Sequence, residues 1–566
     1  MAEQDSRMEA ERQMLRRAQQ QGMGGRLVTY LRLSGPGWLQ SAITLGGGSL
    51  ANGLFLGIFA GFGLLWVQPM AMLLGVVMLG AIAYVTTTTG ERPFRAINRH
   101  VNPVLGWSWL LASLMANIVW SLPQYSLASG VLQQNLLPGV VGPDSPLGDT
   151  GGKVVLSIAV LILTTLVTWT YDSGRWGTKL YEAILKTMVA GIVFCFFGVV
   201  FALRNELPWG EVLAGFVPDP SQLYRPSSNF TDLLAAVPDT YRQFWSDLIV
   251  KEQQGVVIGA AATAVGINMT FLYPYSMLAK GWTREFRGLA IFDLATGMLI
   301  PFMLATSCVV IAAANQFHPK VGSVAPPAGE TLAPERAEEL IAERLAFLQA
   351  NRGNQEAEAA TDRQPLTESE SAIALWLTRR DAFDLARSLA PLTGPRVANY
   401  VFGLGVLGMT LSTITILMLI SGFCVCEMLN VPARGWPHRL GCLAAAAGVL
   451  GPFLWSGEAR FWLAVPTSVF GMMLLPIAYW TFFLLMNQKS LLGDDRPRGA
   501  GRVIWNGLML CACSVAAYLC IEAIRISPFG PDGDYPYGFA ILGGLVALAV
   551  AAQIARWAGW IKTGDA

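Results

Sequence analysis

The sequence has 566 residues, of which 53% are hydrophobic and only 14% are charged, and its formal net charge is +1. Soluble domains usually carry about 25% charged residues, so this composition excludes an ordinary soluble globular protein and favours a membrane protein. A balanced net charge gives no reason to expect nucleic acid as a partner.

Long apolar stretches without charges alternate with charged connectors along the chain. Each stretch reaches the roughly 20 residues that are needed to cross a bilayer, so we predict an all-α membrane protein with about 12 transmembrane helices. The predicted spans are 37–61, 63–88, 104–136, 153–171, 183–203, 255–279, 288–314, 397–426, 440–457, 461–486, 503–526 and 537–558. The predicted parts are an N-terminal tail (1–32), spans one to seven (33–314), a polar insertion (315–395), spans eight to ten (396–493) and peripheral spans eleven and twelve with the C-terminus (494–566).

Basic and acidic connectors alternate. The basic residues are Arg7, Arg12, Arg16, Arg17, Arg26 and Arg32 in the tail, Arg92, Arg95 and Arg99 after span two, and Lys280, Arg284 and Arg287 after span six. Because cytoplasmic loops of membrane proteins are enriched in Lys and Arg, this pattern predicts an integral protein of a cell (inner) membrane with both termini in the cytoplasm.

Glycines interrupt the first span at Gly46, Gly47 and Gly48, followed by Ser49, and a second interruption lies around Gly266 to Thr270, five spans later. Each glycine costs about 1 kcal/mol against alanine within a helix. Unwound backbone at membrane depth is tolerated only where it faces protein, water or a solute. Broken segments in corresponding positions of two halves indicate the binding site of a secondary transporter. The alternative is that these glycines only permit close helix packing.

The segment 315–395 is polar and rich in Glu, Ala, Arg and Pro. We expect helices at Pro334–Gln349 and Ser371–Leu389, joined by a flexible linker, and a short amphipathic helix near Thr231–Leu248 in the preceding connector. The insertion either caps the outer face or acts as a partner-binding or gating subdomain.

Asp293 in span seven is the main ionisable residue at mid-membrane depth. An intramembrane acid is often functional, although we favour a structural or gating pair over a coupling site here. No GxxxxGK[ST] run is present, so ATP-driven transport is not expected. We also expect no enzymatic activity and no cofactor, with the lipid bilayer and a small solute or ion as partners and the oligomeric state open.

Several motifs together resemble NRAMP metal-ion transporters. They are Gly35-Pro36-Gly37-Trp38, then Leu45 to Ala51, Gly63 to Val67, Ser412-Thr413-Ile414-Thr415, Leu475-Pro476, and Asn487 to Gly493. This resemblance implies a LeuT-like fold, in which spans 1–5 and 6–10 form a 5+5 inverted repeat with broken helices 1 and 6.

The metal-binding residues of that family are replaced in this chain. Where the family has a first-span Asp and Asn, this sequence has Gly46 and Ser49. The sixth-span Met-Pro-His motif aligns with Asn268, Met269 and Thr270, and the tenth-span Gln aligns with Ser468. The third-span proton-pathway motif falls on Gln124 to Leu127, and a further sixth-span His aligns with Tyr275. We therefore place no metal ligand with confidence.

A neutral site of this kind allows different substrates. Hard cations are bound mainly by carboxylates and soft ones by thiolate, thioether or imidazole, so a metal ion would be held weakly, for example as hydrated Mg²⁺. Backbone amides at Gly46 to Gly48 could instead bind an anionic group of an amino-acid-like solute. The hydrogen-bond partners would be Ser49, Asn268, Thr270 and Ser468, with walls from Trp120, Tyr273 and Tyr275.

Three functions remain open at this point. The first is an NRAMP-like secondary transporter, working by alternating access, whose degenerate site binds a (divalent) metal ion. The second is a carrier of a small neutral, zwitterionic or anionic organic solute. The third is a non-transporting receptor or scaffold. Gln124, Asp293 and Tyr275 are the coupling or gating candidates, although an interhelical hydrogen bond is the simpler role for Gln124.

Overall fold

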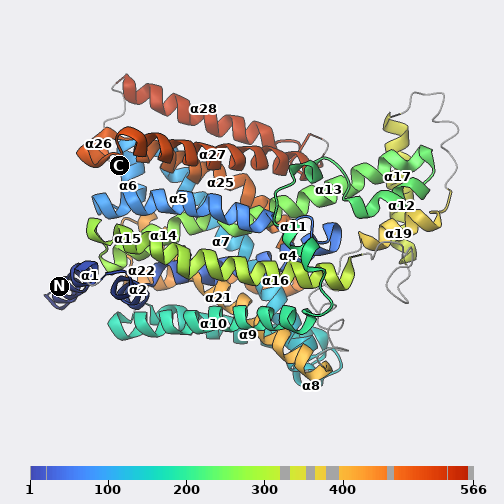
Figure 1. The fold of residues 1–566 in the computed structure, drawn as a ribbon, viewed down its shortest axis with the longest axis horizontal. Helices are drawn as coiled ribbons and strands as arrows, with labels where there is room; N and C mark the ends of the chain where they lie inside the picture. Colours follow the sequence, from blue (N-terminus) through green and yellow to red (C-terminus); the bar gives the residue numbers. More distant parts are fainter. Residues whose placement is uncertain are drawn as a thin grey trace.

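A computed structural model describes residues 2–20, 22–171, 173–318, 332–351, 364–377, 394–454, 464–531 and 533–558. All regular secondary structure in these ranges is helical, and the helices form one bundle with a smaller helical cluster beyond one end (Figure 1). The predicted all-α class is confirmed.

The first five spans follow in chain order, the first of them in two pieces. They are α3 (Pro36–Thr44) with α4 (Gly47–Ala60), α5 (Val67–Thr89), α7 (Pro103–Val131), α9 (Gly148–Thr170) and α10 (Gly174–Leu203). Two helices, α1 (Ala2–Gln20) and α2 (Gly22–Leu33), precede them, and the short helix α6 (Pro93–His100) joins α5 to α7. Proline occupies the start of α3, α6 and α7, where its missing N–H costs nothing.

The second five spans also begin with a broken helix. They are α13 (Asp239–Ala264) with α14 (Ile267–Lys280), α15 (Arg287–Leu294) with α16 (Ile300–Phe317), α21 (Pro395–Met428), α22 (Gly435–Cys442) with α23 (Gly451–Leu454), and α25 (Ala464–Met486). After the short α26 (Lys489–Leu492), the peripheral spans α27 (Gly499–Ile526) and α28 (Gly538–Trp557) follow. This is the expected 5+5 arrangement with broken helices 1 and 6.

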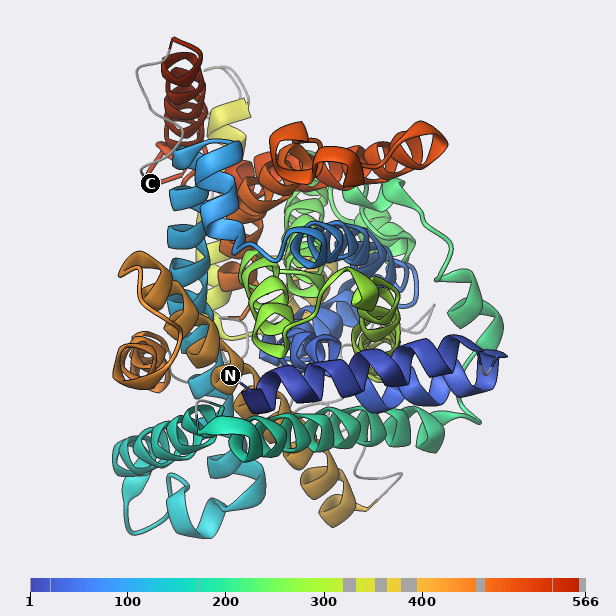
Figure 2. The same ribbon diagram turned by 90° about the vertical axis from the view of Figure 1, so that its left-hand side faces the viewer.

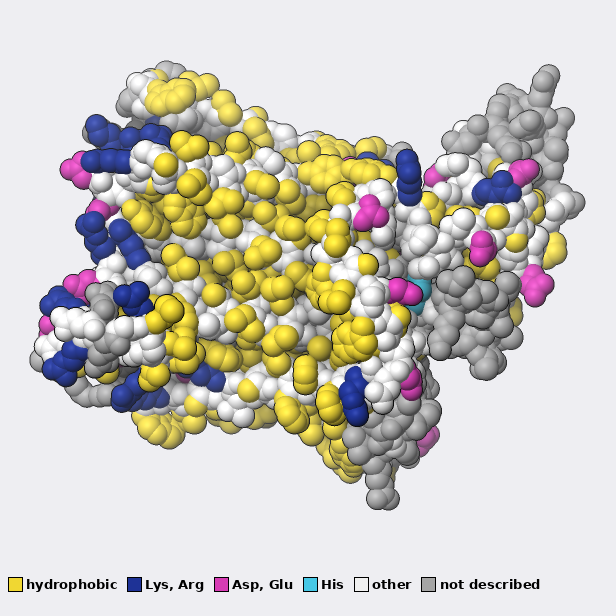
Figure 3. Space-filling view, in the orientation of Figure 1, with side chains coloured by type: hydrophobic (Ala, Val, Ile, Leu, Met, Phe, Trp, Pro, Cys, Tyr) yellow, Lys and Arg dark blue, Asp and Glu magenta, His cyan; other side chains and the backbone are white. Residues whose placement is uncertain are grey.

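Eleven of the twelve predicted spans are long and apolar enough to cross a membrane, when the bent pair α3 and α4 is counted as one. The described part of the ninth, predicted at 440–457, consists of α22, a 3₁₀ segment and α23; the rest falls outside the described residues. Figure 3 shows hydrophobic side chains over the middle of the bundle and Lys and Arg gathered at one end. The chain is therefore an integral, multi-span membrane protein.

The end with the basic side chains also carries the start of α1 and the end of α28, and we call it the terminal face (Figures 1 and 2). Helix α1 lies across this face beside α2. Arg16 forms an ion pair with Glu285 at 2.9 Å, and Leu15 is buried. The first 32 residues are thus largely helical, and part of them packs against the bundle.

The opposite end carries α17 (Pro334–Asn351) and α19 (Glu368–Trp376), which pack with α12 (Thr231–Ala236) and the start of α13 around a second, smaller hydrophobic core. The short helix predicted near 231–248 is present as α12 but ends at Ala236, because residues from Asp239 onward already belong to α13. The predicted helix at 334–349 is confirmed. Most of the one predicted at 371–389 lies outside the described residues.

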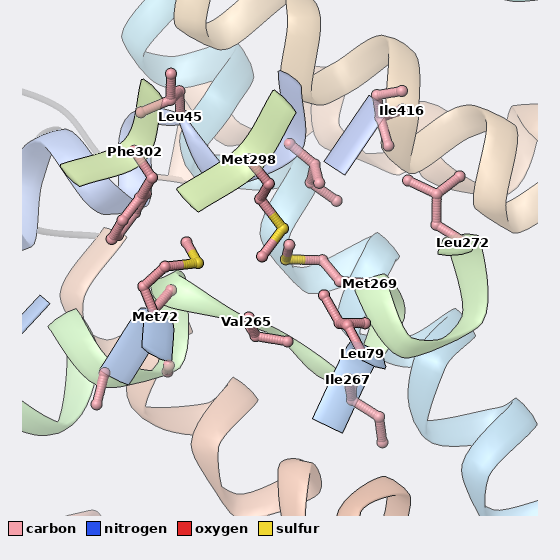
Figure 4. Packing of buried hydrophobic residues seen from close by; sticks show 14 of the residues in the cluster. Leu45, Met72, Leu79, Val265, Ile267, Met269, Leu272, Met298, Phe302 and Ile416 are labelled. Carbon is pink, nitrogen blue, oxygen red and sulfur yellow. The ribbon is translucent and has the colours of Figure 1, made fainter. Parts of the chain in front are cut away.

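The main hydrophobic core surrounds both breaks. Leu45 at the first break and Val265, Ile267 and Met269 at the second belong to one buried cluster (Figure 4). Dense packing fixes side-chain positions, so the two breaks are held in a defined relation to each other.

Candidate functional site

The first break bends the span by 53° between α3 and α4. Gly46 has an extended backbone, with φ −108° and ψ 179°. Neighbouring side chains bind the polar backbone groups that the break releases: the amide of Gly47 donates to Gln124 Oε1 at 3.0 Å, and the carbonyl of Thr44 accepts from the Ser49 hydroxyl. The helix is therefore unwound at the glycine run, as the sequence predicts. The unwinding is tolerated because side chains of the protein form hydrogen bonds with the exposed backbone amide and carbonyl groups.

The second break lies at Val265 and Gly266, both extended. The amide of Gly266 donates to the sulfur of Met269 at 3.3 Å. Two residues of α3, one helical turn apart, bind the same methionine: Gln40 Nε2 donates to its carbonyl at 3.1 Å and Thr44 Oγ1 to its sulfur at 3.3 Å. Met269 thus links the two breaks.

A small buried cavity of about 30 Å³ lies between the breaks. Its walls are Ile43, Gly46, Gly48, Ser49, Trp120, Pro123, Gln124, Thr263, Met269, Thr413, Thr467 and Ser468. A cavity of this size is large enough to hold a water molecule. Seven residues predicted for the site, its walls or its coupling line it, from four different spans.

Met269 lines the cavity, although the sequence alignment had matched its neighbour Asn268 to the metal-binding methionine of the family. A shift of one residue turns a helical side chain by about 100°, so the alignment alone could not decide between them.

Three predicted site residues do not line the cavity. Gly47 lies beside it, bound to Gln124. Asn268 donates instead to Asn117 Oδ1 at 3.0 Å, and Thr270 accepts from Trp109 Nε1 at 2.9 Å.

The remaining gating candidates lie elsewhere. The Tyr275 ring stacks on Phe271, with ring centroids 4.5 Å apart. Asp293 is fully buried at the start of α3, where it accepts from Gly35 N at 3.1 Å and Gly37 N at 2.6 Å. Ser34 also donates its hydroxyl to this carboxyl group. Asp293 therefore caps the first half of the broken span.

Sequence reasoning missed Gln40, Thr44, Asn117 and Thr413 as parts of this region. Gln40 and Thr44 are four residues apart and so share one face of α3, which was a usable signal. Thr413 lies in the stretch that resembles the family, and it donates to Met409 O at 2.8 Å. Nothing in the sequence pairs Asn117 with Asn268.

The cavity has no charged lining residue, so its electrostatics come from dipoles. Helices α4 and α14 begin at the breaks and present partial positive charge, while α3 and α13 end there and present partial negative charge. The side chains add hydroxyl, amide and thioether groups. Among the described residues, no group of three or more His, Cys, Asp or Glu could hold a metal ion.

A family profile described as natural resistance-associated macrophage protein-like matches residues 37–335 and 371–522. None of the curated proteins compared with the chain matches it significantly.

Solved structures of two transporters are similar over nearly the whole chain. A variant of the Eremococcus coleocola manganese transporter is 15% identical, covers 93% of this chain and 94% of its own, and has a TM-score of 0.49. Mhp1, a nucleobase-cation-symport-1 family transporter in a closed conformation with bromovinylhydantoin bound, is 14% identical, covers 94% and 93%, and has a TM-score of 0.48.

Proposed function

Because the chain belongs to the family of natural resistance-associated macrophage protein-like membrane transporters, we propose that it moves a small metal cation by alternating access. The cation binds at the cavity between the two breaks and keeps part of its hydration shell. In this proposal the terminal face is cytoplasmic, because that face collects the Lys and Arg side chains.

The small neutral cavity is the observation that carries this proposal. About 30 Å³ accommodates an ion or a water molecule but not an amino-acid-sized solute. Neutral oxygen and thioether groups compensate poorly for the loss of a divalent ion's hydration. A cation that retains water ligands suits this lining chemically better than a dehydrated one, and it requires a smaller widening of the cavity than an amino acid would.

A polar network at the terminal face supports gating there. Lys280 forms an ion pair with Glu182 at 3.0 Å, and Lys186 Nζ donates to Ser34 O at 2.9 Å. With the Asp293 cap, these contacts connect α10, α14 and α15 to the start of α3. Release of this network would free the first half of span one, as an opening toward the terminal face requires.

The test is uptake into proteoliposomes that contain the purified full chain, with Mg²⁺, Mn²⁺ and an amino-acid panel offered in turn. We expect Mg²⁺ uptake above that of empty liposomes and Mn²⁺ affinity no better than roughly millimolar. Since neither Gln124 nor Thr270 titrates, the rate should be nearly flat between about pH 5.5 and 7.5.

Met269→Leu, which keeps the volume but removes the sulfur, should alter the Mg²⁺ to Mn²⁺ preference. Met298→Leu, at another fully buried methionine of the same core, is the control. Uptake of an amino acid but no metal would favour the organic-solute carrier. No uptake of any probe by correctly folded protein would favour a receptor or scaffold.

A further inference from the structure

Helix α28 is packed unlike the other spans. None of its residues is buried, although its hydropathy is as high as theirs. Its hydrogen bonds to the bundle are near its C-terminal end. Asn102 Nδ2 donates to Ala549 O at 2.8 Å, and Arg556 Nη1 and Nη2 donate to the carbonyls of Val101 and Arg99 at 2.6 and 2.5 Å. Figure 2 shows this helix at the rim of the bundle.

A groove of about 910 Å³ lies between α28 and the helices α25 and α7, and residues along the whole of α28, from Gly538 to Trp557, line it. Its walls are mostly apolar and include Met473, Ile477 and Trp480 on one side and Leu545 and Val546 on the other. A helix of 20 residues is about 30 Å long, which matches the thickness of the hydrocarbon core. The groove is therefore long enough for extended acyl chains.

The polar lining residues gather at the terminal end of the groove. They are His100, Asn102, Gln488, Gln553 and Arg556. No Asp or Glu lines the groove, and the terminal face around it carries other basic side chains. An apolar channel with a cationic, hydrogen-bonding mouth at the membrane surface is complementary to a lipid with an anionic headgroup.

We propose that the groove between α28 and α25 is a binding site for one anionic phospholipid, with its acyl chains along Ile477 and Leu545 and its headgroup at Arg556. The lipid fills the space that protein side chains leave open and so attaches α28 to the bundle. If a second copy of the chain filled the groove with an apolar helix, the polar residues at its mouth, including Arg556, would lack an anionic partner.

Native mass spectrometry of the full-length protein tests this site, with phosphatidylglycerol and phosphatidylcholine titrated separately. We expect one retained phosphatidylglycerol and weaker phosphatidylcholine binding. Leu545→Trp fills the groove and should remove the retained lipid. Leu548→Trp, on the outward side of α28 and 62% exposed, should not.

Arg556→Gln should reduce the preference for phosphatidylglycerol about fivefold. Arg434→Gln, an exposed arginine in the connector before α22, should leave it unchanged. Equal lipid retention in both tryptophan variants would overturn the proposal, as would equal affinity for the two headgroups. So would a dimer that Leu545→Trp dissociates, because the groove would then hold a second copy.

Discussion

Replacement of Asp293 by asparagine should loosen the first half of span one without unfolding the protein. Asp293 accepts hydrogen bonds from the backbone amides of Gly35 and Gly37 and from the Ser34 hydroxyl. Asparagine keeps one acceptor oxygen and turns an NH₂ group toward the other donor. The Gly37 amide, 2.6 Å from the present carboxylate oxygen, would then lose its acceptor.

The size of the effect follows from that single bond. A buried donor without a partner costs about 1 to 3 kcal/mol, and about 2 kcal/mol corresponds to a roughly 30-fold change in a local opening equilibrium. Amide hydrogen exchange reports such openings. We expect amides of α3 to exchange roughly 30-fold faster in Asp293→Asn, with the exchange of α21 and α25 unchanged.

Glu427→Gln is the matched control, because Glu427 is also a buried carboxyl group, and its ion-pair partner, at 2.9 Å, is Arg92 at the start of α6. It should leave α3 exchange at its wild-type rate. Unchanged α3 exchange in Asp293→Asn would refute the capping argument. Faster exchange throughout the bundle would instead mean that Asp293 stabilises the whole fold.

Three further predictions concern the cavity, the insertion and the topology. At Gly48 an added Cβ would lie 3.0 Å from Thr263 Cγ2 and 3.3 Å from Ser468 Oγ, so Gly48→Val should abolish uptake while the detergent-solubilised protein stays monodisperse. Gly53→Val, where the nearest atom is Val309 Cγ1 at 3.4 Å, should transport; equal misfolding of both variants would mean that the glycines only serve packing. In the insertion, burial opposes ionisation of Glu370, but hydrogen bonds from Thr367, Trp245 and Arg344 outweigh it and hold its pKa below the usual value. A carboxyl group whose pKa is lower in the folded than in the unfolded protein stabilises the fold at pH values above its unfolded-state pKa. This stabilisation is lost as the pH falls through its folded-state pKa. Thermal unfolding of the insertion, followed by tryptophan fluorescence, should therefore shift to lower temperature on acidification below about pH 4.5, and a shift of equal size in Glu370→Gln would contradict this. For topology, Glu338→Cys on the exposed side of α17 should react with an impermeant maleimide in intact cells, and labelling only after permeabilisation would reverse the proposed orientation.

Much of the fold follows from the sequence because a bilayer imposes simple rules. Span length and the absence of charge mark the helices, and the glycine run at Gly46 to Gly48 marks the first break. The ninth span was harder to predict as a regular helix, because its described part includes a 3₁₀ segment from Leu443 to Leu450. The start of α13 was predicted too late in the sequence. Its first part packs in the smaller hydrophobic core outside the main bundle and carries charged residues, which are typical of a connector between spans.

The resemblance to the family grouped Gly46, Ser49, Met269 and Ser468 in one predicted neutral site. The structure places all four side by side around one small cavity, although their function as a binding site stays a prediction. The sequence alone could not assign Met269 rather than Asn268 to the cavity, since one residue of register changes which side of the helix faces inward.

The membrane class, the approximate positions of both breaks and the neutral character of the residues around them could be predicted from the amino-acid sequence, because each of these depends on local composition. In contrast, the packing of the folded chain was needed to find that Met269 links the breaks, that Asp293 caps α3 and that α28 leaves a groove beside α25. Those features depend on contacts between residues up to hundreds of positions apart, and the packing of the whole bundle fixes them.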